Sequence, residues 1–208
     1  MSDEETLKLV ILGEGRVGKT SILSKYFTKK FNEGEKSTTN PSFYKMTKEY
    51  QGKTVNFNIW DTAGQEQFNA LNTLYYQNAV GALLVYDVSI VETFDKVKDW
   101  VHTLQEAVGK DITFVIAGNK IDLISDKNMK DKNDAKINQY CTQQNCKHFY
   151  TSAKTGYNLN ETFESLVKSV LEKVMKNNQG NKKDGSSIKI QSKKKKIKDV
   201  VNKLKNIF

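Results

Sequence analysis

The sequence predicts an α/β fold of three layers, in which a six-stranded, mostly parallel sheet carries helices on both faces. Strand and helix patterns alternate along the chain, which is typical of such sheets. The runs Gly81–Tyr86 and Ile112–Ala117 are apolar apart from Thr113, as in strands that are buried on both faces. Between them, Val91–Val108 repeats apolar residues at the spacing of a helix.

The remaining elements follow from the same patterns. They are the strand Leu7–Leu12, the helix Lys19–Phe27, a hairpin of Ser42–Tyr50 and Lys53–Trp60 around Gln51–Gly52, the strand Lys147–Thr151 and the amphipathic helix Leu159–Met175. In sheets of this class, ligands bind beyond the carboxyl ends of the strands. Four polar or glycine-rich segments each follow a predicted strand, so we expect them to converge on one rim of the sheet.

Composition and charge divide the chain in two. We expect residues 1–176 to form one domain and residues 177–208 to form a flexible tail, because the stretch NNQGNKKDGSS after Lys176 has no apolar periodicity. The formal net charge is +9. From Asn181 onward there are ten lysines and two aspartates, a net charge of +8, so the domain itself is nearly neutral.

The composition favours a cytoplasmic protein. No apolar run approaches the roughly 18 residues that span a bilayer. The acidic start Met1–Glu5 lacks the pattern of a secretory signal. The two cysteines, Cys141 and Cys146, make neither a disulfide framework nor a metal-binding set, and we expect both to be reduced thiols.

The first of the four segments, GEGRVGKT, is typical of a phosphate-binding loop. Its glycines let backbone N–H groups curl around phosphates, and the helix that follows points its positive end at them. Lys19 would reach the β- and γ-phosphates and the Thr20 hydroxyl would bind Mg²⁺. The alternative is a simple glycine turn between strand and helix. The candidate nucleotide-binding residues here are Gly13, Glu14, Gly15, Arg16, Val17, Gly18, Lys19, Thr20 and Ser21.

The second segment, DTAG, predicts a metal and γ-phosphate contact. Asp61 ends a predicted strand, where its carboxylate would hold Mg²⁺ through water. Gly64 would offer its backbone N–H to the γ-phosphate. Gln65 would orient the attacking water as the catalytic residue, in a reaction driven mainly by positioning and electrostatics. A turn with a surface glutamine is the alternative.

The third and fourth segments, NKID and SAK, identify the base. Asp122 would accept two hydrogen bonds from guanine, which adenine does not offer on that edge, so a buried Asp122 would be left unpaired with adenine. Asn119 and Lys120 precede it. The loop Ser152–Lys154, with Ala153 at its centre, would present a backbone N–H to the guanine carbonyl. Surface turns are the alternative, and SAK is weak evidence alone.

From about Leu7 to Met175 the chain resembles the small GTPases of the Ras superfamily, and among them the Rab family. The stretches that carry the resemblance are FNIWDTAGQEQF, LYYQNA and LLVYDVS, and GEG, FNAL and VYDVS resemble the early-endosomal group of Rabs. The resemblance implies that Phe31 stacks on guanine and that Thr38, or alternatively Thr39, binds Mg²⁺ and the γ-phosphate. It also implies that effectors read the nucleotide state through Phe43, Trp60 and Tyr75, where core packing is the alternative role.

The chain departs from the Rab pattern at three places. The first switch contains Asn40–Pro41, in which proline restricts Asn40 to extended conformations. Gln67 stands where Rabs usually have arginine. No cysteine lies near the end of this sequence, so we expect the chain to lack the prenylation motif that the family resemblance implies.

Two features leave alternatives open: the role of the only arginine and the binding partner of the basic tail. Arg16 lies in the phosphate loop and is either an internal arginine finger or a solvated side chain. Lys193–Phe208 places apolar residues on one helical stripe and lysines opposite, as in helices that lie on anionic membranes. A sequence that ends before its cysteines, or a solvated or partner-binding tail, is the alternative. We expect no nucleic-acid binding, since the tail lacks a groove or stacking surface.

The sequence therefore predicts a guanine-nucleotide switch that binds GTP or GDP with Mg²⁺ and hydrolyses GTP slowly. We expect it to act in vesicle or endosomal traffic, and to cycle between the cytoplasm and the membrane. The resemblance implies an exchange factor, a GTPase-activating protein and effectors as partners. Two alternatives stay open: a nucleotide-bound scaffold that does not cycle, and an ATPase with the same phosphate loop.

Overall fold

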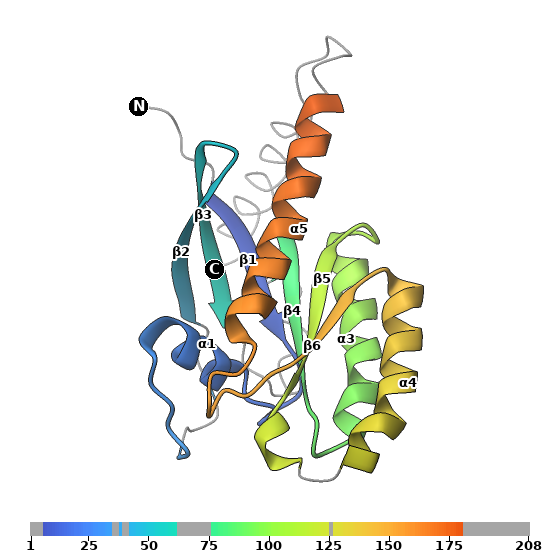
Figure 1. Ribbon diagram of the computed structural model, residues 1–208. Coiled ribbons are helices and arrows are strands. Elements are labelled where there is room, and N and C mark those ends of the chain that lie inside the picture. The colour runs from blue at the N-terminus through green and yellow to red at the C-terminus, as the bar shows by residue number, and fades with distance from the viewer. Residues whose placement is uncertain (1–5, 35–37, 39–41, 62–75, 125–126, 181–208) are drawn as a thin grey trace, which may run out of the picture. The chain divides into compact units, whose positions relative to one another are not determined.

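A computed structural model describes residues 6–34, 38, 42–61, 76–124 and 127–180. Figure 1 shows one sheet with helices on both of its sides. Its strands lie in the order β2-β3-β1-β4-β5-β6. Among the described strands, β2 and β3 pair antiparallel and the other four neighbouring pairs are parallel. The predicted α/β fold with a six-stranded, mostly parallel sheet is confirmed.

The predicted elements are all present, with ends that differ by a few residues. The strands are β1 (Thr6–Leu12), β2 (Ser42–Tyr50), β3 (Lys53–Asp61), β4 (Ala79–Asp87), β5 (Thr113–Asn119) and β6 (Lys147–Tyr150), and the helices are α1 (Lys19–Thr28), α3 (Glu92–Val108), the short 3-10 helix η2 (Ile121–Leu123), α4 (Lys127–Gln144) and α5 (Leu159–Gly180). The sequence did not predict α4 or η2. Helix α5 also continues through residues 177–180, where we expected a flexible linker. Those residues include no proline, and each helical residue adds a backbone hydrogen bond.

Alternating side chains of the central strands face two helical layers. Val10 and Leu12 of β1 belong to a buried cluster with Trp100 of α3 and Ile137 of α4. The other face of the sheet packs on the first turns of α5. A Cβ at Gly81 of β4 would lie 2.5 Å from Val170 Cγ2 and 3.0 Å from Leu9 Cδ2, so only glycine leaves room for that packing. Tyr26 of α1 packs on Phe163 of α5, with ring centroids 4.2 Å apart.

The β2–β3 hairpin closes with a two-residue turn. Gln51 and Gly52 have φ of +50° and +72°, the left-handed values that a type I′ turn requires, and Tyr50 pairs with Lys53 beside them. At the other end of β3, Asp61 is opposite Ser42 of β2 and beside Ile11 of β1. The hairpin thus places the last residue of β3 at the rim where β1 ends.

The contacts between Cα atoms divide the chain into Met1–Val170 and Leu171–Phe208, a boundary inside α5. The expected domain of residues 1–176 and tail of residues 177–208 stay predictions. Among the described helices, none combines the length and apolar character needed to cross a membrane.

Candidate nucleotide site

The loop between β1 and α1 folds around the side chain of Lys19. This side chain is buried, and its ammonium donates hydrogen bonds of 2.8 Å to the carbonyl oxygens of Gly13 and Glu14. Burial lowers the pKa of Lys19 to about 8, although the carboxylates of Asp61 and Glu14 oppose this shift. The loop therefore holds a poorly hydrated cation, which a phosphate group would stabilise.

Two glycines shape this loop because a side chain would not fit. A Cβ at Gly13 (φ +143°) would lie 2.1 Å from the carbonyl oxygen of Val85, and one at Gly18 (φ +97°) would lie 2.4 Å from Asn119 Nδ2. Gly18 also caps α1, whose first turn has no acidic residue and no side-chain cap. No side chain of the helix's own first turn therefore competes with a phosphate for the first N–H groups of α1.

Three oxygen-bearing side chains lie in the neighbourhood of Lys19. The hydroxyl oxygens of Thr20 and Thr38 are 2.5 Å apart, although these residues lie on different segments. Asp61 is fully buried at the end of β3, near enough to Lys19 to influence its pKa. Hydroxyl and carboxylate oxygens are the ligands that Mg²⁺ prefers, so this set fits the ion. Thr39, the alternative to Thr38, lies outside the described residues.

A single buried side chain joins three of the predicted segments. Asn119 is 1% exposed at the end of β5. Its Nδ2 donates to the carbonyl oxygen of Val17 in the phosphate loop (2.9 Å), and its Oδ1 accepts from the N–H of Ala153 (3.0 Å). The phosphate loop, the NKID segment and the SAK loop are therefore fixed relative to one another, as the rim prediction requires.

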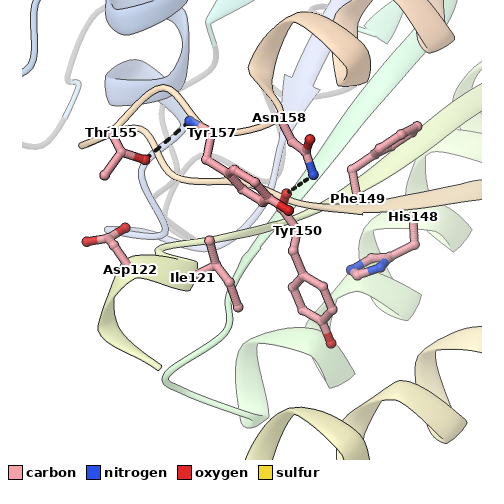
Figure 2. A pocket seen from close by; sticks show the side chains of 8 residues that line it. All are labelled: Ile121, Asp122, His148, Phe149, Tyr150, Thr155, Tyr157 and Asn158. Atoms are coloured by element: carbon pink, nitrogen blue, oxygen red, sulfur yellow. Dashed lines mark hydrogen bonds between the residues drawn. The ribbon is translucent and has the colours of Figure 1, made fainter. Parts of the chain in front are cut away.

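Asp122, the residue predicted to recognise the base, lies on η2, and its Oδ1 accepts a 2.5 Å hydrogen bond from the Ser152 hydroxyl. η2 is a single turn at the surface, and Asp122 is exposed. Figure 2 shows Asp122 and Thr155 at one end of a pocket of about 420 Å³. The pocket is lined by Ile121, Asp122, His148, Phe149, Tyr150, Thr155, Tyr157 and Asn158. Asp122 therefore borders open space rather than the core.

Two supporting residues were missed by sequence reasoning. Asp87, buried at the end of β4, forms a 2.6 Å ion pair with Lys120, whose own φ is +67°. In α3, Trp100 donates from Nε1 to Glu14 Oε1 over 3.2 Å. Asp87 pairs in register with Asn119, and a carboxylate that ends an apolar strand is the signal that could have identified it.

The remaining predicted residues are less enclosed. The Arg16 side chain is exposed, and its backbone has a left-handed conformation (φ +64°). Phe31 is half-buried. Phe43 is 47% exposed, and its ring centroid lies 5.4 Å from that of Trp60, which is half-buried and packs against the hydrophobic core. The predicted residues Gly64, Gln65, Tyr75 and Lys193–Phe208 lie outside the described residues.

The fold and these contacts define a phosphate-loop nucleotide-binding protein of the GTPase class. Residues 8–172 match the model of the Ras family. The chain is 42% identical to Ras-related protein Rab-21 of Mus musculus over 80% of this chain and 74% of that protein. It is 39% identical to GTP-binding protein YPT53 of Saccharomyces cerevisiae over 79% of this chain and 76% of that protein.

The chain therefore belongs to the Ras family, as a Rab-type small GTPase of the early-endosomal group. This confirms the resemblance on which the sequence interpretation relied. The protein is a GTP-binding switch that regulates endosomal membrane traffic.

Proposed function

We propose that this chain binds GTP and GDP with Mg²⁺ at the rim described above and hydrolyses GTP slowly to GDP and phosphate. The observation that supports this most is the side chain of Asn119, which bonds both the phosphate loop and the SAK loop. One ligand with a phosphate end and a base end would contact both loops at once.

At the phosphate end, the Lys19 ammonium would exchange its carbonyl partners for phosphate oxygens. Thr20, Thr38 and Asp61 would hold Mg²⁺, the last through water. The ion would neutralise phosphate charge when bound. Thr38 would then connect the first switch to the γ-phosphate, so that the order of this segment depends on the nucleotide.

At the base end, Asp122 would accept two hydrogen bonds from guanine, and Phe31 would stack on the ring. Ser152 holds the Asp122 carboxylate at 2.5 Å and so orients it. Displacement of a fluorescent GDP by GDP and by ATP tests this selectivity. We expect ATP to displace it only in large excess, and equal displacement by both would favour the ATPase alternative.

For hydrolysis, Gln65 would orient the attacking water, with the Gly64 N–H on the γ-phosphate. Single-turnover conversion of GTP to GDP tests this step, and we expect it to be lost in Gln65→Leu while GDP binding persists. A wild-type chain that binds GTP without any conversion would instead be the scaffold. Arg16→Ala in the same assay decides whether Arg16 acts as a finger, because an unchanged rate leaves it a solvated side chain.

We further propose that effectors bind Phe43, Trp60 and Tyr75 and the switches, and that an exchange factor and an activating protein act on the same switches. Phe43 supports this, since a large aromatic side chain that is nearly half exposed is available to a partner. Phe43→Ala is expected to leave GDP affinity unchanged and to abolish GTP-dependent retention of an effector.

The tail Lys193–Phe208 is proposed to bind the anionic cytoplasmic face of endosomal or other vesicle membranes. Its lysines would each contribute about 1 kcal/mol near such a surface. Sedimentation with phosphatidylserine vesicles compares the full chain with a chain that ends at residue 180. Equal sedimentation of the two at low salt would remove this proposal.

A further inference from the structure

An ion pair joins two distant segments at the base end of the site. Lys154 Nζ lies 2.7 Å from Glu33 Oε1, although 121 residues separate them. Both side chains are mainly exposed, at 55% and 74%. Each charge stabilises the other: the pKa of Glu33 is lowered by its hydrogen bond to Lys154, and that of Lys154 is raised by the same bond.

Each partner is attached to a segment that would flank the base. Glu33 lies two residues after Phe31, in a turn where Asn32 Oδ1 accepts the N–H of Gly34 at 3.0 Å. Lys154 directly follows Ala153, which Asn119 holds. The carboxylate of Asp122 also contributes to the raised pKa of Lys154, so this ammonium lies near the guanine-recognition residue as well.

We propose that the Glu33–Lys154 ion pair is a latch across the base end of the site, which slows the release of bound guanine nucleotide. The proposal rests on the nucleotide site proposed above. For a nucleotide to leave, the segment that carries Phe31 and the SAK loop must separate, and this separation breaks the ion pair. An exchange factor that moves either segment would open the same latch.

The expected effect is small and depends on salt. An exposed ion pair contributes little free energy to holding two segments together. Its removal should therefore make nucleotide release only about two to five times faster. The distance over which salt screens a charge is about 3 Å at 1 M and about 30 Å at 0.01 M, so high salt weakens the attraction between the two side chains. Wild type should therefore release nucleotide faster as salt rises, and a chain without the pair should respond much less.

The test measures release of fluorescent GDP from the full chain, chased with excess GDP and Mg²⁺, at low and high salt. Glu33→Gln should release it about two to five times faster than wild type at low salt, and at the same rate at high salt. The matched control is Glu49→Gln, because Glu49 is an exposed glutamate on β2, and this variant should behave as wild type.

A double-mutant cycle shows whether the effect passes through Lys154. In a Lys154→Gln background, Glu33→Gln should change nothing further. Equal release from wild type and Glu33→Gln at low salt, or the same acceleration by Glu33→Gln with and without Lys154, would overturn the latch. A chain that binds no GDP at all would instead overturn the proposed function, so the two failures are distinguishable.

Discussion

Replacing Asn119 by alanine tests the central feature of the site. The change removes a donor from the Val17 carbonyl oxygen at 2.9 Å and an acceptor from the Ala153 N–H at 3.0 Å. Both bonds are buried, and a buried polar group left without its partner costs about 1–3 kcal/mol. The two together give about 2–6 kcal/mol, shared between stability and nucleotide affinity, since a factor of ten is about 1.4 kcal/mol.

The assay combines urea unfolding of the nucleotide-free chain with competition measurements of GDP affinity. We expect Asn119→Ala to lose at least about 2 kcal/mol over the two measurements combined. Asn138→Ala is the control, because Asn138 is an exposed residue on α4. If Asn119→Ala matched this control in both measurements, the three loops would not depend on Asn119, and the reasoning would be wrong.

Three further predictions concern other residues. Lys19, whose pKa is lowered to about 8, is partly neutral above that pH, and bound phosphate would raise its pKa again. GDP binding at about pH 9 should therefore take up a proton and weaken by up to about tenfold per pH unit, and calorimetric heats that do not depend on the buffer would contradict this. Asp87→Asn removes the ionic partner of Lys120 and should weaken GDP binding by about 1–3 kcal/mol in a competition assay, whereas unchanged affinity would make the pair irrelevant. Gly81→Ala places a Cβ 2.5 Å from Val170 Cγ2 and should destabilise the chain by about 1–3 kcal/mol, so an unchanged urea midpoint would refute the packing described for β4.

The parts of the site that could be predicted are short and contiguous. GEGRVGKT and NKID each hold their candidate functional residues in a few consecutive positions, so the spacing of these residues alone predicts a ligand. Asp87 could not be assigned in this way, because its role depends on lying beside Asn119 in a neighbouring strand. Glu33 was missed for the same reason, since its partner is 121 residues away.

The fold was predictable where apolar periodicity is strong. Helix α4 was missed because its sequence, KNMKDKNDAKINQYCTQQ, has few apolar residues and so shows little periodicity. The exposure of Asp122 could not be predicted from its segment alone, because it depends on η2 being a single turn at the surface.

The tight hairpin turn at Gln51–Gly52 fixes the position of Asp61, which lies at the far end of β3. Pairing of β2 with β3 starts at Tyr50 and Lys53 and ends at Ser42 and Asp61. One residue inserted into this turn would shift β3 along its neighbours by about 3.3 Å or turn its side chains to the opposite face. The carboxylate of Asp61 would then no longer lie beside Lys19. The conformation of an exposed reverse turn thus determines whether the charge balance of the buried site is kept.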